Sequence, residues 1–225
     1  MEEKEEMLNL ILGRNEEKYG NRMSTLQMAL SVARYLSCYK PGQDYTWNGF
    51  KFDRNMGKNE YETLWRPTDP KSDILAALSL YLNVLEQLGV MFFQDDRNKK
   101  LNGIKLVMQK YSSMINDKGV KKKITAIKCL RHSLAHNFGL VSSGKEKYKY
   151  ILLFDDDKKN SIVELPDDSW KGTWTDKNDN TSTKIYVINL IKEIESIIEK
   201  VQSDNEITFA KDIEEIKSRF TIITE

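Results

Sequence analysis

SDILAALSLYLNVLEQLGVMFF, residues 72–93, is the stretch that decides the fold. Apolar side chains recur in it at the three- and four-residue spacing of one helix face, at Leu75, Leu78, Leu82, Leu85, Leu88 and Phe92. Ile74, Leu80 and Tyr81 widen this apolar stripe. A helix that is apolar over so much of its surface has to be covered by other elements, so we predict a central helix capped by Ser72 or Asp73.

The same helical spacing continues on both sides of this stretch. Helices are predicted over 2–18, 23–39, 101–114, 120–137, 185–201 and 209–220. We expect Ser24 or Thr25 to cap the second of these helices, and Pro41-Gly42 to end it. Residues 40–71 are irregular and rich in aromatic side chains, which we expect to anchor the loop to the core.

The pattern changes at residues 147–165. Strand-forming residues dominate 147–154, a polar turn follows at 155–160, and alternation returns at 161–165. This pattern is typical of a β-hairpin. The order of elements predicts a mainly α fold, a helical bundle with a β-hairpin inserted before the last long helix. We expect one domain over 1–225, with N-terminal helices and the aromatic loop at 1–71, the bundle core at 72–201 and a C-terminal helix at 202–225.

Composition excludes several classes of protein. The chain has 225 residues and a formal net charge of +1, so RNA binding would require a local basic patch and not a global field. Polar residues interrupt the segment 74–93, which we expect to be too polar to span a bilayer, and the acidic N-terminus lacks the features of a secretory signal. Cys38 and Cys129 are far apart within apolar helical patterns, which predicts two buried, reduced thiols. A cytoplasmic protein without a membrane partner fits these features best.

The segment RHSLAH, residues 131–136, contains both histidines of the chain. In a structural interpretation, His136 finishes a helix before Asn137 and Gly139, where the helix dipole favours a positive charge. In a second interpretation, His132 and His136 share a metal ion, because residues four apart lie on one helix face. The segment holds no carboxylate, however, and no third ligand is evident. The chain also lacks a Gly-rich phosphate loop and zinc-type Cys/His spacing, so we assign no metal and no cofactor.

The third interpretation is metal-independent RNA cleavage. Arg131 supplies a planar, permanent cation suited to a charged phosphorane, and His136 can take a proton from a ribose 2′-hydroxyl. Residues five apart lie about 140° apart around a helix, so the two side chains of one copy do not converge easily. Two copies that face each other across a two-fold axis would bring both pairs to one cleft.

Arg131, the polar residue after it and His136 resemble the R-x(4–6)-H signature of HEPN domains, in which Asn, His or Asp follows the Arg. Here that residue is His132. The order of the surrounding elements over about 72–201 is also similar to HEPN proteins. The resemblance implies an up-down helical bundle, a homodimer through the Val120–Phe138 helix and a metal-independent endoribonuclease, often in a defence system or a toxin–antitoxin pair. The implied catalytic residues are Arg131, His132 and His136, and the implied partners are RNA and an antitoxin protein.

Substrate contacts are expected from neighbours of this motif, Ser133, Asn137 and Lys128. Lys121–Lys123 either steer RNA toward Arg131 or form a solvated helix face. Two other functions stay open: a non-catalytic HEPN-like protein that binds RNA, nucleotide or a protein partner, and a helical protein without a ligand. Burial of both histidines against apolar residues would favour the last of these.

Overall fold

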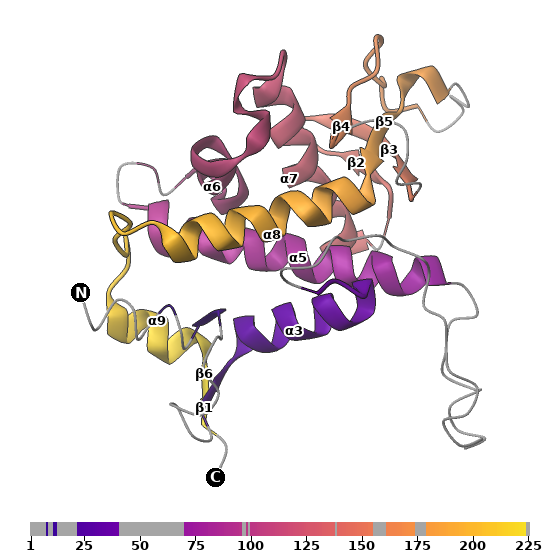
Figure 1. Ribbon diagram of the computed structural model, residues 1–225. Helices are drawn as coiled ribbons and strands as arrows, with labels where there is room; N and C mark the ends of the chain where they lie inside the picture. The colour runs from indigo at the N-terminus through magenta and orange to yellow at the C-terminus, as the bar shows by residue number, and fades with distance from the viewer. Residues whose placement is uncertain are drawn as a thin grey trace, which may run out of the picture.

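The computed structural model describes residues 8, 11–12, 22–40, 70–95, 98, 100–137, 139–154, 161–173 and 179–223. This part of the chain is mainly helical and carries a small four-stranded sheet, which confirms the predicted class. Helix α5 (Pro70–Phe93) runs through the middle and contacts α3, α6, α7 and α8 (Figure 1). The bounds of these neighbours are α3 (Thr25–Ser37), α6 (Gly103–Tyr111), α7 (Val120–Asn137) and α8 (Val187–Ser203).

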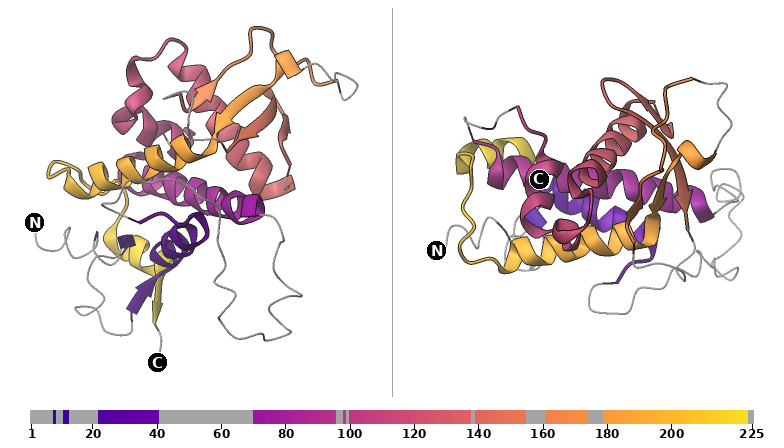
Figure 2. Two further views of the ribbon diagram at one scale, coloured as in Figure 1. Left: turned by 45° about the vertical axis from the view of Figure 1, so that its right-hand side comes forward. Right: turned by 90° about the horizontal axis from the view of Figure 1, so that it is seen from above.

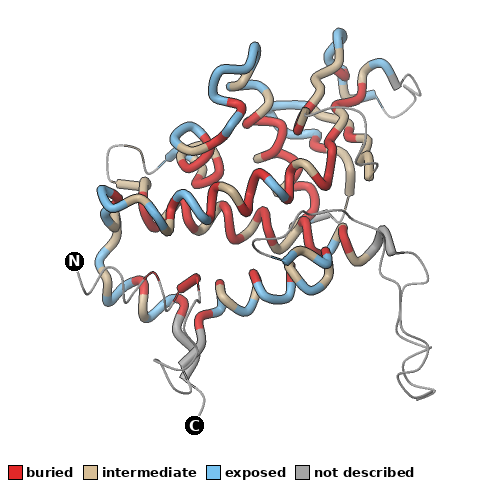
Figure 3. Tube along the Cα trace, viewed as in Figure 1, coloured by how far each residue is buried: buried red, intermediate tan, exposed pale blue. Residues whose placement is uncertain are grey.

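α5 is the central helix that its sequence predicts. Its apolar stripe is fully buried at Ile74, Leu78, Tyr81, Leu82, Leu85 and Leu88, and the buried faces of α5 and α8 lie toward each other (Figure 3). The helix begins at Pro70, two residues before the predicted cap, because proline is well suited to a first helical position, where no backbone donor is needed. Asp73 lies in the first turn, where the helix dipole favours a negative charge.

The expectation that this segment is too polar for a bilayer is not supported by composition. Asp73–Phe93 is long and apolar enough to cross a membrane, and no other helix in the described ranges is. Burial supplies the better argument, because 56% of an 18-residue apolar window within this stretch is buried inside the fold. A core helix of a soluble protein has this property.

α3 is confirmed with small corrections. Ser24 caps it, since its hydroxyl accepts hydrogen bonds from the backbone N–H groups of Leu26 at 3.0 Å and Gln27 at 3.4 Å. The helix ends before Pro41, at Cys38, which has a left-handed backbone with φ 57°. Cys38 is exposed there, so the prediction of a buried thiol is wrong for Cys38 and right for Cys129.

α7 has its predicted bounds, and the other helices match the predicted ones in place but differ in length. The predicted helix 101–114 is shorter, because Asn102 caps α6 and Ser112 begins a separate 3-10 turn, η1 (Ser113–Asn116). α9 (Ile213–Phe220) is the core of the predicted helix 209–220. After it, β6 (Thr221–Ile223) pairs antiparallel with β1 (Arg22–Ser24), and neither strand was predicted. Most of the helix 2–18 and of the aromatic loop 40–71 lies outside the described residues, although Leu8, Ile11 and Leu12 are helical and buried.

The predicted hairpin over 147–165 is wrong, although both of its strands exist. The sheet order is β2-β3-β5-β4, with β2 (Val141–Ser143), β3 (Lys147–Leu153), β4 (Val163–Glu164) and β5 (Thr183–Tyr186). β3 pairs antiparallel with β2 and parallel with β5, and β4 pairs with β5 alone. β5 takes the place between them because its side chains Thr183, Ile185 and Tyr186 are buried and need cover. Ile185 therefore belongs to a strand, and the predicted helix 185–201 begins at Val187.

The sheet lies at the end of the bundle where α8 begins, beside α7 (Figure 2). β2 and β3 contact α7, and the Tyr150 hydroxyl donates a hydrogen bond of 2.8 Å to the backbone oxygen of Ala126. α7 is thereby held between α5 and α6 on one side and the sheet on the other.

Candidate functional site

α7 carries the RHSLAH segment, and its exposed and half-buried side chains gather mostly on one face, which buried Thr125 interrupts. We call this face the α7 stripe; it consists of Lys121, Lys128, His132, Ala135 and His136, which lie within about 100° of one another around the helix. His132 and His136 are exposed, with ring centroids 4.5 Å apart and planes tilted by 50°. Since neither imidazole is buried against apolar side chains, the main ground for treating them as core histidines is absent.

Arg131 points away from the histidines, toward α5. Its Nη2 lies 2.6 Å from Oε2 of Glu86, and its Nε donates a hydrogen bond of 3.1 Å to Oδ1 of Asn83. The second carboxylate oxygen of Glu86 accepts a hydrogen bond from the side-chain amide of Asn102. The exposed fractions of the Arg131 and Glu86 side chains are 22% and 14%, so this ion pair is partly shielded from water. One copy of the chain therefore does not bring Arg131 and His136 to the same point.

The predicted substrate-binding neighbours differ in their surroundings. Ser133 is buried, and its hydroxyl lies 3.0 Å from the backbone oxygens of both Cys129 and Val141, where it ties α7 to β2. Its side chain is therefore remote from solvent. Lys128 is half-buried and lies one turn before His132 on the α7 stripe. Asn137 is the last residue of α7, and its side chain lies outside the described residues.

A hollow of about 350 Å³ lies beside the Arg131–Glu86 ion pair, between α5, the start of α6 and α7. We call it the α6 hollow. The residues that line it include Glu86, Lys100, Leu101, Asn102, Lys105 and Lys128. Sequence reasoning identified only Lys128. The nearest signal for the rest was the run Lys99-Lys100 shortly before the N-cap Asn102, which by itself is typical of a charged turn.

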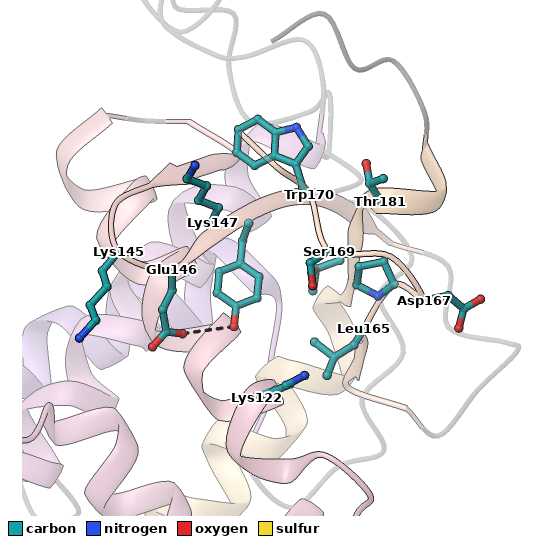
Figure 4. A pocket seen from close by; sticks show the side chains of 12 residues that line it. Lys122, Lys145, Glu146, Lys147, Leu165, Asp167, Ser169, Trp170 and Thr181 are labelled. Carbon is teal, nitrogen blue, oxygen red and sulfur yellow. Dashed lines mark hydrogen bonds between the residues drawn. The ribbon is translucent and has the colours of Figure 1, made fainter. Parts of the chain in front are cut away.

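A second hollow, of about 440 Å³, lies on the other side of α7, against the sheet (Figure 4). Lys122 reaches it from α7, and Trp170 closes the opposite end. The Tyr148 hydroxyl donates to Glu146 at 3.4 Å, the dashed line in Figure 4. Burial, together with the charge of Glu146, raises the pKa of Tyr148, so the phenol stays a neutral donor. Trp170 is buried, and its indole N–H donates a hydrogen bond of 3.2 Å to the backbone oxygen of Thr173, which anchors its loop.

The histidine pair lacks a third ligand for a metal ion. Within the described ranges of the chain, no three His, Cys, Asp or Glu side chains come together in a way that could hold one. His132 and His136 therefore lie against each other, and no carboxylate or thiol of the described residues completes a metal site with them.

Arg131 and His136 offer a cation and a proton acceptor on one helix, with the cation held by α5 and the imidazole in solvent. No family model matches the chain, and no curated protein or solved structure matches it either.

Proposed function

We propose that this protein is a cytoplasmic, HEPN-type endoribonuclease that works without a metal ion and acts as a homodimer. The observation that carries the proposal is the exposure of His132 and His136 near the end of α7, a helix that packs against α5, α6 and the sheet. Two imidazoles in solvent, one turn apart and next to an arginine, contribute little to stability, and they have the chemistry to move a proton near neutral pH.

In the proposed reaction, His136 takes the proton of a ribose 2′-hydroxyl. The 2′-oxygen attacks the adjacent phosphorus, the bond from phosphorus to the 5′-oxygen breaks, and that oxygen leaves with a proton. The products are a 2′,3′-cyclic phosphate and a 5′-hydroxyl. Arg131 stabilises the charge on the phosphorane, and His132 orients the reacting groups.

The separation of Arg131 and His136 within one copy supports the proposed homodimer. A second α7 that packs along the α7 stripe would place the histidines of one copy near the arginine of the other. Ala135, half-buried beside the histidines at one edge of the stripe, is small enough to allow two helices to approach closely. A toxin–antitoxin pair or another defence system is the biological setting that the HEPN resemblance favours, with an antitoxin protein as the further partner.

A second candidate function is non-catalytic binding of RNA, nucleotide or a protein. The observation that favours it is the ion pair between Arg131 and Glu86, which already occupies the guanidinium group. In this alternative, Arg131 has a structural role and no RNA is cut.

Cleavage of labelled RNA in the presence of EDTA distinguishes these candidates. We expect wild-type protein to cleave and to leave 2′,3′-cyclic phosphate ends. His136→Ala and Arg131→Ala should each lower the rate by about 100- to 1000-fold, since each removes a group that acts on the transition state. Arg131→Lys should rescue poorly, because lysine lacks the planar fork, and His132→Ala should cost less.

Arg219→Ala is the matched control for the loss of an arginine, because Arg219 is exposed on α9 and pairs with Glu215 at 3.5 Å. It should cleave like wild type. Activity that disappears on chelation and returns with a divalent metal would contradict the mechanism. An inactive wild type in which His136→Ala lowers stability by about 1 kcal/mol would point to a helix-ending role instead.

A further inference from the structure

The α6 hollow concentrates positive charge. Lys100, Lys105 and Lys128 reach it from the loop before α6, from α6 and from α7. Among the described residues, none of the three makes an ion pair or a side-chain hydrogen bond with an acidic residue. The carboxylate of Glu86 is already occupied by Arg131 and Asn102. Three lysine charges therefore surround a hollow in which Glu86, the acidic residue among the described lining residues, is neutralised.

The frame of this hollow is rigid. A Cβ added to Gly89 would lie 1.8 Å from the backbone oxygen of Gly103, so α5 and α6 touch backbone to backbone at this point. Asn102 caps α6 by accepting a hydrogen bond of 3.0 Å from the N–H of Ile104, and its amide donates to Glu86. The backbone that carries the lysines is thus held in place before any ligand arrives, which lowers the entropic cost of binding.

The arrangement is unfavourable unless an anion is present. Lys105 lies in the first turn of α6, where the positive end of the helix dipole disfavours a cation. Lys100 and Lys128 add like charges around the same space. A phosphate group would relieve both costs at once, through charge pairing with the lysines and through the dipole of α6.

We infer that the α6 hollow binds the phosphodiester backbone of single-stranded RNA next to the bond that is cut; this inference rests on the proposed function. Glu86 joins the hollow directly to Arg131, and Lys128 lies one turn from His132 on the α7 stripe. A strand whose scissile phosphate lies at Arg131 would therefore place a neighbouring phosphate among the three lysines. Leu101, with an exposed fraction of 45%, offers an apolar rim for a base.

Binding of a fluorescent single-stranded RNA of mixed sequence tests this subsite. It is measured over a range of salt concentrations in the His136→Ala background, in which cleavage is expected to be about 100- to 1000-fold slower. The triple variant Lys100→Gln, Lys105→Gln and Lys128→Gln should bind about tenfold more weakly or worse. The slope of log affinity against log salt should fall by about 0.7 for each phosphate contact that is lost. Equal melting temperatures for the variants, expected because glutamine keeps most of the side-chain length, would show that the fold is intact.

The matched control replaces three exposed lysines elsewhere, Lys118→Gln, Lys145→Gln and Lys171→Gln, with the same change in net charge. This control should keep the RNA affinity and the salt slope of the His136→Ala protein. Equal losses in the two triple variants would overturn the subsite, because general charge would then explain the binding. Inorganic phosphate and a mononucleotide serve as competitors. Either one competing as well as unlabelled RNA would show a site for a small phosphate and overturn the RNA backbone as its ligand.

The binding and cleavage experiments can refute the proposed subsite and the proposed nuclease activity independently. RNA binding that depends on the three lysines, in a wild type that cuts no RNA, would keep the subsite and refute the nuclease. Cleavage by a wild type whose RNA binding ignores the three lysines would refute the subsite and keep the nuclease.

Discussion

At the scale of single residues, Glu195 is a buried charged group that depends on hydrogen bonds from two other helices. Its carboxylate is fully buried and accepts hydrogen bonds from Arg34 Nε at 2.8 Å, Arg34 Nη2 at 2.7 Å and the Tyr81 hydroxyl at 2.7 Å. Burial, followed by the charge of Glu195, raises the pKa of Tyr81, which keeps the phenol a donor. These three side chains join α8, α3 and α5, so the ion pair links the helices that form the bundle.

Removing the arginine should therefore be costly. Arg34→Ala leaves a buried carboxylate without its cation, and we expect the free energy of unfolding to fall by about 3–5 kcal/mol. Arg34→Lys keeps the charge but loses the two-point contact with the carboxylate. Its free energy of unfolding should therefore lie between those of the wild type and Arg34→Ala. Urea denaturation measures these differences. Arg219→Ala breaks an exposed ion pair and should cost less than about 1 kcal/mol. Similar losses for Arg34→Ala and Arg219→Ala would contradict the role of the buried pair.

Asp204, just after α8, predicts a pH dependence. The Tyr111 hydroxyl at 2.5 Å and then Lys110 Nζ at 3.1 Å lower the pKa of Asp204 to about 2 from its ordinary 3.8. A lowered carboxyl pKa stabilises the fold above pH 4, and this contribution disappears as the pH falls from about 4 to 2. Because the carboxylate lies near the surface, Asp204→Asn should cost less than about 1 kcal/mol at pH 7.

The difference between wild type and Asp204→Asn should vanish near pH 2, which thermal unfolding at several pH values can measure. Asp168→Asn, in the exposed loop after β4, is the matched control and should change stability little at pH 7. A difference for Asp204→Asn that persists below pH 2 would show that the lost interaction is not that of the ionised carboxylate.

At the scale of elements, the crossing of α5 and α6 depends on two glycines. A Cβ at Gly89 would come within 1.8 Å of the Gly103 backbone oxygen. The two helices would have to move apart to relieve this clash. Alanine in a helix interior gains about 1 kcal/mol of intrinsic propensity over glycine, but the clash is the larger effect. We expect Gly89→Ala to lose about 3 kcal/mol, the upper part of the usual range for overpacking. Gly144→Ala meets nothing within 4 Å and is the control; equal stability of the two variants would refute the close contact.

What the sequence predicts well depends on how much of an element's pattern is local. α7 was predicted with its observed bounds, because an uninterrupted amphipathic stretch carries its own period. β5 was missed because it has only four residues and continues without a break into the helical spacing of α8. The predicted hairpin failed because alternation identifies a strand but does not specify its partner, and here a distant strand lies between the two.

For the candidate site, too, local features could be predicted and long-range contacts could not. Arg131, His132 and His136 stand out by their spacing on one helix, which is local information. The contacts of Arg131 with Glu86 and Asn83 depend on how α5 packs against α7, and no periodicity in either helix indicates them. The α6 hollow was missed for that reason, since its lysines meet only after three separate segments have packed.

At the scale of the whole molecule, a net charge of +1 conceals an uneven distribution. The α6 hollow gathers three lysines around a neutralised carboxylate, whereas the hollow against the sheet mixes its lysines with Glu146 and Asp167. The α7 stripe runs between these two hollows and adds Lys121 and the two histidines. A weakly charged protein can thus present a local surface suited to a polyanion, on the same side as the residues proposed to cut it.

In the proposed mechanism this surface is complete only in a dimer, because one copy holds Arg131 toward α5 and turns His136 to solvent. We expect sedimentation velocity to show a homodimer at micromolar concentration. Ala135→Glu should produce monomers, since a bulky charged side chain beside the histidines on the α7 stripe would keep two α7 helices apart. Ala76→Glu, an exposed alanine of α5, introduces the same charge elsewhere and should remain dimeric. Ala135→Glu should also lose cleavage while keeping its fold, because each active site needs groups from both copies. A wild type that stays monomeric at this concentration, or an Ala135→Glu monomer that cleaves RNA at the wild-type rate, would contradict a shared site across the two-fold axis.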